Sequence, residues 1–423
     1  MLDDRVGMDD AFPSARPMAA IQSAHSAINL SVADDLASVA DEWGEFETTA
    51  DCTAFQSFAW HAAWQKCVGA LTGVIPAIVV GRKCDRIIFI MPLAVERGKL
   101  ASRLVWHGSD LCDYNAPLLA PDFSAVVAAP GAFVAVWQDV VARLQADSRF
   151  RHDVVVFTKM PETVGAQANP FVALPTTLNP SGAYATPLTE DWDSFYASKR
   201  SATTRRSERA KRKRLAEFGE VRFVTAEKPA EIVATLTRLV DQKSKQFARM
   251  GVEDIFLKPG YRDFFFDVAS NPSAGCFAHV SRLEVGETVA AANLGLVFGN
   301  RYYHVLASHD LGPVSRFSPG VAHLHDLMRF AILRKCVAFD FTIGDEGYKR
   351  GWSHATILLH DHRRAASIRG WAVLLPSLLL VRAKRLIKQT PILWRMAQAT
   401  RSLIARLARR AEPTDGAPES AEP

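Results

Sequence analysis

The clearest pattern in the chain lies between Arg316 and Lys349, where apolar residues recur first at helical spacing and then at alternate positions. The first set falls on one face of a helix and comprises Val321, Leu324, Leu327, Met328, Ala331 and Ile332. Residues 336–341 are predicted to form a strand, with one face made of Val337, Phe339 and Phe341 and the other of Cys336, Ala338 and Asp340. This stretch is therefore predicted to be a loop, a helix, a strand and a polar turn.

The loop before this helix has the residues of a helix N-terminus. Ser318 is a favourable N-cap, Pro319 fits the first helical position, and Gly320 permits close approach of another group to the backbone. Free backbone N–H groups and the helix dipole point outward together at such a terminus, which makes it a ready anion site. The charged turn at 345–349 follows the strand, where a substrate group could meet a bound phosphate-bearing cofactor.

The first half of the chain shows strand and helix patterns in alternation. A helix is predicted after Thr53, and the runs 75–81 and 86–96 are predicted to be two strands of a hairpin joined by polar residues. Further predicted elements are a strand and polar loop over 100–120, an amphipathic helix over 131–146 and a strand over 152–160. Together these elements make the first half an α/β unit.

The second half is predicted to hold helices followed by a three-stranded meander. Helical patterns cover 199–214, 230–251 and 258–270, with a short strand at 221–224. The meander strands are 276–284, 288–298 and 301–308. Gly299-Asn300, between the last two strands, has the composition of a two-residue hairpin turn.

With 423 residues, the chain is too long for one ordinary domain. The patterns predict a flexible leader (1–45), an N-terminal lobe (46–160), a linker (161–180), a C-terminal lobe (181–362), a basic amphipathic helical tail (363–410) and a disordered end (411–423). The linker is rich in Pro, Thr and Asn, and the last residues have the composition of a disordered segment.

Composition narrows the class of protein. Hydrophobic residues make up 48% of the chain and charged residues 22%, as in ordinary globular proteins. A net charge of +5 is small for a dedicated nucleic-acid binder of this length. The six cysteines have no C-x-x-C spacing, which favours free thiols in a reducing cytosol over a zinc site. Early acids argue against a signal peptide, and no apolar run reaches the roughly 18 residues of a membrane span, so a cytoplasmic location is expected.

No metal site is predicted from the histidines either. The pairs His323/His325 and His360/His362 have i, i+2 spacing, which on a helix points the two rings to different faces. His304, in the meander, is predicted to be a core or cleft histidine.

Two segments are strongly basic. Residues 199–214 carry nine basic side chains and one acid, which suits a solvated face, a docking surface for an anionic acceptor or for cofactor phosphates, or an RNA contact. No aromatic residue is interleaved there, which argues against stacking on single strands. Residues 363–410 contain no acid and mix Arg and Lys with Trp and Leu. They suit basic amphipathic helices on an anionic membrane surface or a partner, or a helix packed back on the domain.

Six pieces of the chain, in this order, resemble the GNAT acetyltransferase superfamily and more closely its CelD-like (cellulose biosynthesis) family, which is related to the Fem-type aminoacyl transferases. The pieces are FQSFAWHAAW at 55–64, MPLAV at 91–95, HGSDLCDYNAPLL at 107–119, RRSERAKRKRLAEFGEVRF at 205–223, FSPGVAHLHDLMRFAI at 317–332 and FDFTIGDEGYKRGW at 339–352. The resemblance implies an α/β (α+β) fold of two GNAT-like lobes, each a mixed, mostly antiparallel sheet flanked by helices.

The resemblance also implies an activity. It implies that the second lobe binds acetyl-CoA or another acyl-CoA, and that the acyl group passes directly to an amine or hydroxyl of a polysaccharide-related or small-molecule acceptor. Such chemistry depends mostly on positioning two bound substrates, so it needs neither a covalent nucleophile of the enzyme nor a metal.

Residues of the 316–349 stretch take roles in this expectation. Backbone N–H groups of the loop would hold the pyrophosphate, with charge added by its first residue; the residues concerned are Arg316, Ser318, Pro319, Gly320 and Val321. The GNAT loop is usually R/Q-x-x-G-x-G/A, and this chain keeps only part of that motif. A plain helix cap is the structural alternative.

Four further residues are expected to carry the transfer. Asp340 or Glu346 would take the proton of the acceptor, Tyr348 would protonate the leaving thiolate, and Lys349 would hold a phosphate or an acceptor carboxylate. The alternatives are that Asp340 only holds a neighbouring backbone group or Arg, and that the turn only braces the site.

Two other functions remain open. One is a Fem-type transferase that uses aminoacyl-tRNA and a peptidoglycan precursor, although the chain has no inserted coiled coil with sustained heptads. The other is a non-catalytic GNAT-fold subunit of a polysaccharide synthase, peripheral to the inner face of the membrane. That subunit would tolerate replacement of Asp340, Glu346 and Lys349.

Overall fold

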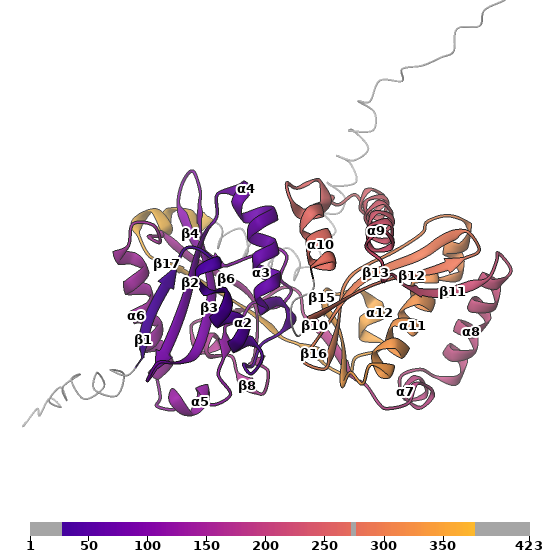
Figure 1. Cartoon of the computed structure of the whole chain (residues 1–423), viewed down its shortest axis with the longest axis horizontal. Helices are drawn as coiled ribbons and strands as arrows, with labels where there is room; N and C mark the ends of the chain where they lie inside the picture. The colour runs from indigo at the N-terminus through magenta and orange to yellow at the C-terminus, as the bar shows by residue number, and fades with distance from the viewer. Residues whose placement is uncertain (1–27, 272–275, 377–423) are drawn as a thin grey trace, which may run out of the picture.

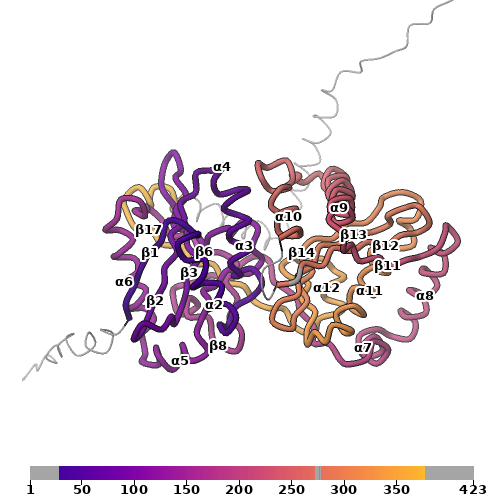
Figure 2. Tube along the Cα trace, viewed as in Figure 1, coloured from indigo at the N-terminus to yellow at the C-terminus, as the bar shows by residue number. Residues whose placement is uncertain are grey.

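The computed structural model describes residues 28–271 and 276–376, which form two lobes side by side (Figures 1 and 2). Each lobe is built on one mixed sheet flanked by helices, so the predicted fold class is confirmed. The predicted disordered end, 411–423, and most of the predicted basic tail lie outside the described residues. Within the described residues, no helix combines the length and the apolar character needed to cross a membrane.

The sheet of the first lobe has the strand order β1-β2-β3-β4-β6-β17-β9, with β5 paired to β3. Its strands are β1 (Asn29–Ala33), β2 (Ile75–Lys83), β3 (Arg86–Arg97), β4 (Ser102–Trp106), β5 (Leu118–Leu119), β6 (Val154–Pro161), β9 (Thr177–Leu178) and β17 (Leu359–Ala365). The lobe's helices are η1 (Ala37–Val39), α2 (Ala40–Glu47), η2 (Ala54–Gln56), α3 (Phe58–Trp64), the π-helix η3 (Gln65–Gly69), α4 (Ala70–Thr72), α5 (Phe123–Val126), α6 (Ala132–Ala146) and η4 (Pro170–Ala173). A separate two-stranded ribbon consists of β7 (Thr163–Val164) and β8 (Gln167–Ala168).

The sheet of the second lobe has the order β11-β12-β13-β14-β15-β10-β16. Its strands are β10 (Ala183–Pro187), β11 (Val221–Thr225), β12 (Cys276–Val285), β13 (Thr288–Phe298), β14 (Arg301–His309), β15 (Ala338–Ile343) and β16 (Thr356–Ile357). Its helices are α7 (Trp192–Lys199), α8 (Ala202–Ala216), α9 (Pro229–Met250), η5 (Ile255–Leu257), α10 (Tyr261–Ser270), η6 (Pro313–Phe317), α11 (Pro319–Leu333) and α12 (Gly347–Arg350). Helices α9 and α10 cover one face of the sheet, and α11 covers the other with α8 beside it (Figure 1).

The two sheets share one topology. In each, four antiparallel strands are followed by one parallel pair, β4 with β6 in the first lobe and β14 with β15 in the second. The helix between the parallel strands is α6 in one lobe and α11 in the other. Each second parallel strand also carries one residue with a positive φ, Lys159 at 57° in β6 and Thr342 at 60° in β15. The fold is therefore an internal repeat, in agreement with the two similar lobes that the resemblance implied.

The strand next to each parallel pair is distant in sequence from it. Strand β10, at the start of the predicted C-terminal lobe, pairs with β15, and β17, which follows the other strands of the second lobe in sequence, pairs with β6. The predicted boundary at residue 362 therefore falls inside a strand of the first sheet. The predicted basic helical tail begins as the end of that strand, and a helix starts only at Ile368.

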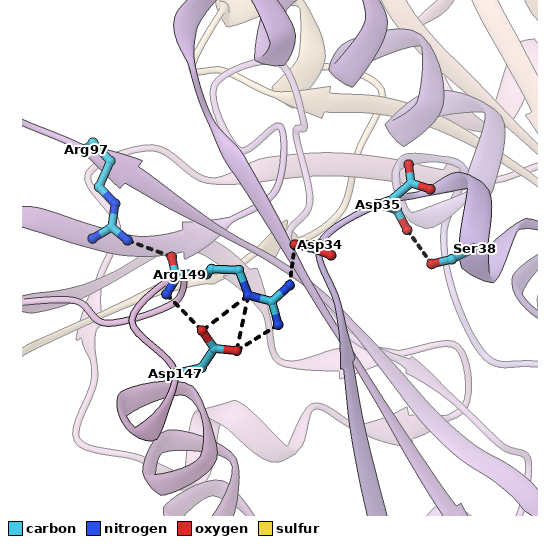
Figure 3. Close-up of polar contacts among 6 residues, drawn as sticks. All are labelled: Asp34, Asp35, Ser38, Arg97, Asp147 and Arg149. Atoms are coloured by element: carbon cyan, nitrogen blue, oxygen red, sulfur yellow. Dashed lines mark hydrogen bonds and ion pairs between the residues drawn. The ribbon is translucent and has the colours of Figure 1, made fainter.

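The predicted leader, 1–45, differs from the structure in its second part. Strand β1 is the edge strand of the first sheet, and Arg149 joins it to the end of α6 (Figure 3). The Arg149 guanidinium lies 2.6 Å from Asp34 and 2.8 Å from Asp147, while Arg97 donates to the Arg149 carbonyl. All three ion-pairing side chains are substantially exposed, so these pairs contribute little to stability.

Other differences are local. The helix predicted over 199–214 is broken at Arg200, because Ser201 begins α8 as an N-cap that accepts a hydrogen bond from the Thr204 N–H at 3.1 Å. The strand predicted over 336–341 begins and ends two residues later, as β15. The predicted turns are confirmed: Gly299 and Asn300 have φ values of 53° and 57°, and Gly251 ends α9 with φ 65°.

A single hydrophobic cluster crosses the boundary between the lobes. Phe55 and Trp60 of the first lobe pack edge-on against Tyr303 and Phe264 of the second, with ring centroids 5.8 and 4.8 Å apart. All four side chains are buried. An ion pair of 2.6 Å between Lys66 and Asp267 lies nearby. Because the contact is apolar and continuous, the two lobes form one packed unit rather than two hinged domains.

Gly260 marks the closest approach between the lobes. It starts α10 with φ 77°, and a Cβ placed there would lie 1.8 Å from the carbonyl oxygen of Cys67 in the π-helix η3. We expect Gly260→Ala to lower the free energy of unfolding by at least about 3 kcal/mol, because left-handed strain adds to a backbone clash. Gly251→Ala is the matched control, since it has φ 65° and open space around it. Urea unfolding should give a cost of only about 1–2 kcal/mol there; equal costs at both glycines would contradict the close contact.

Candidate active site

The parallel strands β14 and β15 diverge and leave a wedge between them. They pair only through residues 301–303 and 338–340. Beyond that, β14 continues along β13 as far as His309, and β15 continues along β10 as far as Ile343. Along the wedge, the backbones of β14 and β15 therefore face each other without pairing. Such edges can bind an extended molecule through its amide groups.

Helix α11 begins at the wide end of this wedge. Ser318 occupies its N-cap position, as predicted, but with φ 57° and ψ 57°, and its side chain makes no capping hydrogen bond. The Ser318 hydroxyl instead lies 3.3 Å from the Lys211 ammonium group of α8. The first turn of α11 thus lacks a side-chain cap. The Val321 N–H donates to the Ser318 carbonyl at 3.0 Å, which leaves the Gly320 N–H available to an anion.

The other predicted loop residues surround this terminus. Pro319 is buried at the first helical position, whereas Gly320 and Val321 are partly exposed. Arg316 is exposed and lies over the Phe317 ring at 4.9 Å. The structure therefore brings Ser318, Gly320 and Val321 together at the helix end, with the Arg316 side chain on its outer side.

His309 ends β14 beside the same terminus. A Cβ on Gly320 would lie 3.7 Å from the His309 ring, which is an ordinary contact. The amide nitrogen of Gln246 donates to the His309 carbonyl at 2.8 Å and lies 3.1 Å from its Nδ1, so α9 closes the wedge from the opposite face of the sheet. Burial lowers the pKa of His309, which keeps the ring neutral at physiological pH.

At the narrow end, Asp340 is buried and fully engaged. Its carboxylate accepts hydrogen bonds from the Tyr114 hydroxyl at 2.8 Å, the Arg301 guanidinium at 3.0 Å and the Thr342 N–H at 2.8 Å. Burial raises the pKa of Asp340, and Arg301 opposes that rise. Since Tyr114 belongs to the first lobe, the carboxylate links the lobes; this geometry favours the holding role of the two that the sequence left open.

Replacing Asp340 tests that geometry. We expect Asp340→Asn to lower the free energy of unfolding by about 2–3 kcal/mol, because the Arg301 charge loses its partner and the side chain can no longer satisfy three donors. The value lies at the low end for a buried pair because the Arg301 side chain is 37% exposed. Chemical denaturation measures it, with Tyr114→Phe as a milder variant. Unchanged stability with lost turnover would instead indicate a direct part in the reaction.

The predicted turn forms the short helix α12 and its approach. Lys349 is buried, and its ammonium group donates to the Ile343 carbonyl at 2.7 Å and lies 3.0 Å from the Glu346 carboxylate. The Glu346 side chain is 58% exposed, and Tyr348 is 40% exposed. Desolvation, together with the charge of Glu346, raises the pKa of the Tyr348 phenol, which therefore stays protonated. Lys349 thus anchors α12 to the end of β15, while Glu346 and Tyr348 face outward.

Asp113, which was not among the predicted site residues, lies at the same junction. Burial raises the pKa of its carboxyl group, and the Lys159 charge, the Thr342 hydroxyl and Lys349 oppose that rise. The side chain remains partly exposed. Asp113 lies in the segment HGSDLCDYNAPLL at 107–119, which the resemblance singled out without assigning a role to any residue. It combines partial access with a raised pKa, which suits a proton acceptor better than the enclosed Asp340.

Two further groups face this region from the second lobe. Burial lowers the pKa of Lys243 on α9, with Glu346 and Lys349 acting on it in opposite senses. His304 on β14 is buried, and desolvation lowers its pKa to about 3, so the ring is neutral. His304 is thus a histidine of the cleft region, one of the two predicted settings. Lys243 gave no sequence signal, because its helix pattern is that of an ordinary amphipathic helix.

The corresponding wedge of the first lobe is filled. Strands β4 and β6 pair only at Arg103 and Leu104 before they diverge, and the space beyond holds packed aromatic rings. The Trp106 ring centroid lies 4.9 Å from that of Phe157 and 4.8 Å from that of Phe171, and all three side chains are buried. Aromatic side chains therefore occupy this region of the first lobe. Among the described residues, no three His, Cys, Asp or Glu side chains gather as metal ligands would.

A comparison with protein families bears on this wedge. Residues 202–350 match the acetyltransferase (GNAT) domain. The match begins at α8 and ends with α12, so it contains β14, α11, β15 and the wedge. The expected resemblance to the GNAT superfamily is confirmed for this segment, which is roughly a third of the chain. A search of curated proteins gave no significant match.

Solved structures extend the likeness to both lobes. A conserved protein of unknown function from Bacteroides thetaiotaomicron is 12% identical, with a TM-score of 0.51 over 79% of this chain and 99% of that one. FemX is 10% identical, with a TM-score of 0.52 over 76% of this chain and 95% of that one. At these identities the likeness shows the fold alone, which is shared over nearly the full length of both proteins.

Proposed function

We propose that this protein is an acyl-CoA-dependent acyltransferase, most simply an acetyltransferase, that uses the wedge between β14 and β15. The observation that carries the proposal is the divergence of β14 from β15 together with a helix N-terminus that lacks a side-chain cap at the wide end, inside the segment that matches the GNAT domain. In the first lobe the equivalent space is packed with aromatic rings, which favours the second lobe as the substrate-binding one.

The residues present fit an acyl-CoA. The first-turn N–H group of Gly320, at the positive end of the helix dipole, suits a pyrophosphate, and Arg316 adds positive charge at the same end. The pantetheine arm of CoA is extended and contains amide groups, which suit the free strand edges of the wedge. Its thioester end then faces the narrow part of the wedge, where the lobes meet.

Side chains at the lobe junction would move the protons. Asp113 takes the proton of the acceptor amine or hydroxyl as that group attacks the acyl carbon. As the carbon–sulfur bond breaks, the Tyr348 phenol gives its proton to the departing thiolate. Glu346, exposed beside Tyr348, is the second group able to accept the acceptor's proton. Asp340 and Lys349 position these groups, by holding the lobes together and by anchoring α12.

The class of acceptor follows from the resemblance to the CelD-like family. We propose an amine or hydroxyl on a precursor of an envelope or extracellular polysaccharide, or a related small molecule. The reaction would take place in the cytoplasm, with the basic residues after 362 bringing the protein to the anionic inner face of the membrane or to a synthase.

A second function is favoured by one observation, the shared fold with FemX over most of both chains. The resemblance to Fem-type transferases would make aminoacyl-tRNA the donor and a peptidoglycan precursor the acceptor. The basic helix α8 would then contact RNA phosphates. The same wedge would serve either donor, so the two functions differ in the molecule that binds α11.

Calorimetric titration of the full chain with acetyl-CoA separates these functions. Saturable one-to-one binding, followed by release of free CoA thiol in the presence of amine or hydroxyl acceptors, supports the acyltransferase. If neither acetyl-CoA nor longer acyl-CoAs bind, the acyl-CoA proposal fails. Titration with aminoacyl-tRNA is then the next measurement.

A further inference from the structure

A cleft lies on the outer side of α11, where α7 and α8 pack over it. It has a free volume of about 130 Å³ and opens beside the N-terminus of α11 at Ser318. Aromatic side chains form one part of its wall: Trp192 stacks on Tyr196 with ring centroids 5.0 Å apart, and the His325 ring lies 5.0 Å from Tyr196. This cleft is separate from the wedge, because the two lie on different sides of α11.

Two nitrogen atoms of the cleft wall have no hydrogen-bond partner within the described residues. They are Nε1 of Trp192 and Nε2 of His325, both fully enclosed by neighbouring atoms. The His325 side chain is only 8% exposed, and its Nε2 lies 3.5 Å from the Glu208 carboxylate without forming a hydrogen bond. Buried polar groups in native proteins normally have partners, so these two nitrogens leave the wall beside the cleft polar and unsatisfied.

The basic side chains of α8 supply positive charge to the cleft. Arg212 is neutralised by Asp326 at 2.8 Å, and Asp326 also pairs with Arg329 at 3.0 Å. Arg209 and Lys211 also line the cleft, and neither has an acidic partner among the residues for which the structure gives contacts. The cleft thus combines an aromatic wall with two cations that have no ion pair of their own among the described residues, and the carboxylates of Asp193 and Glu208 also line it.

We propose that this cleft binds the 3′-phosphoadenosine end of CoA, an inference that rests on the proposed acyltransferase function. The adenine ring lies against the Trp192 and Tyr196 wall, next to the unpartnered nitrogens of Trp192 and His325. The 3′-phosphate takes the charges of Arg209 and Lys211. The pyrophosphate then lies at Ser318, which borders the cleft and begins α11. Helices α7 and α8 would thereby select the whole cofactor over its pantetheine part.

Features of the cleft favour a single nucleotide over an RNA strand. The aromatic rings lie in one enclosed wall, whereas single strands bind on successive exposed rings along a groove. The residues of α8 that face solvent are basic but not aromatic. The open end at Ser318 also places the nucleotide beside the proposed pyrophosphate site.

Calorimetry with CoA and 3′-dephospho-CoA tests the assignment on the full chain. We expect the wild-type protein to bind CoA roughly 10- to 100-fold more tightly, which is the range for losing charge-assisted hydrogen bonds. The double variant Arg209→Ala/Lys211→Ala should reduce that preference to less than about threefold. Arg206→Ala/Lys213→Ala is the matched control, because it removes the same charge from exposed positions of the same helix that do not line the cleft.

The outcomes distinguish the cleft from the wedge. If the control variant keeps the preference for CoA, the result supports binding of the 3′-phosphate in the cleft. Equal losses of preference in both double variants would overturn that assignment and indicate a long-range charge effect. Equal wild-type affinities for the two cofactors would overturn it as well, and would leave the proposed acyltransferase function standing. Absence of binding by both cofactors is failure of the proposed function itself. Binding of a short single-stranded RNA in place of CoA would also overturn the assignment.

Discussion

Replacing Gly320 by aspartate is expected to abolish most binding of acetyl-CoA while leaving the fold intact. Gly320 lies in the first turn of α11, and its open side meets only the His309 ring at 3.7 Å, so a side chain fits there. A carboxylate within about 4 Å of a phosphate opposes it by about 1–4 kcal/mol, depending on the local dielectric, which corresponds to a loss of affinity of roughly 5- to several-hundred-fold. Isothermal calorimetry measures that loss.

Stability provides the internal control for this variant. An acid in the first helical turn interacts favourably with the helix dipole, and removal of a glycine restricts the unfolded chain. Gly320→Asp should therefore unfold at the same denaturant concentration as the wild type or a higher one. Gly320→Ala is the matched variant without charge, and we expect it to keep affinity within a few-fold. If Ala and Asp weaken binding equally, the helix terminus does not contact the pyrophosphate.

Local signals in the sequence predicted most of the second lobe. Antiparallel strands joined by short turns leave a pattern within a few residues of each other, as Gly299-Asn300 does between β13 and β14. The amphipathic helix α9 and its glycine end are equally local. The loop, helix and strand around α11 were predicted for the same reason, and so was the anion site at their start.

What could not be predicted depends on distant partners. Strand β17 joins the first sheet by pairing Met160 with His360, residues that are two hundred positions apart, and no local pattern identifies that pairing. The left-handed backbone of Ser318 likewise differs from that of an ordinary N-cap, and it leaves the α11 terminus open. The sequence therefore predicted which residues lie at this helix terminus, but not the backbone conformation of Ser318.

The proton acceptor is the clearest case of this limit. Asp340 was predicted to be a proton acceptor because its charge lies on a strand near the turn. In the structure, Tyr114 and Arg301, which are distant in sequence, bind its carboxylate and enclose it. Asp113 looked like any loop carboxylate until the fold brought Lys159 and Thr342 to it. The choice between these acids depends on burial and neighbours, which only the assembled lobes determine.

Asp113→Asn is accordingly expected to lower kcat by about 10²–10⁴-fold, the usual contribution of a general base, with little change in the affinity for acetyl-CoA. Because burial raises the pKa of Asp113, the wild-type rate should fall as pH drops through that raised value, and the variant should lose this dependence. Thiol release from acetyl-CoA, with an acceptor that supports turnover, measures both effects.

The free energy of unfolding of Asp113→Asn distinguishes a general base from a side chain with a purely structural role. A carboxyl group whose folded pKa is raised is stabilising only in its protonated form, and its charge costs stability once the pH exceeds that pKa. At neutral pH, Asp113→Asn should therefore leave the free energy of unfolding unchanged or raise it. The pKa of Asp340 is also raised, but its carboxylate pairs with the Arg301 guanidinium at 3.0 Å, so its replacement leaves that charge without a partner and should lower the free energy of unfolding. Glu346→Gln completes the comparison: if it loses the turnover that Asp113→Asn retains, the proton passes to Glu346 instead.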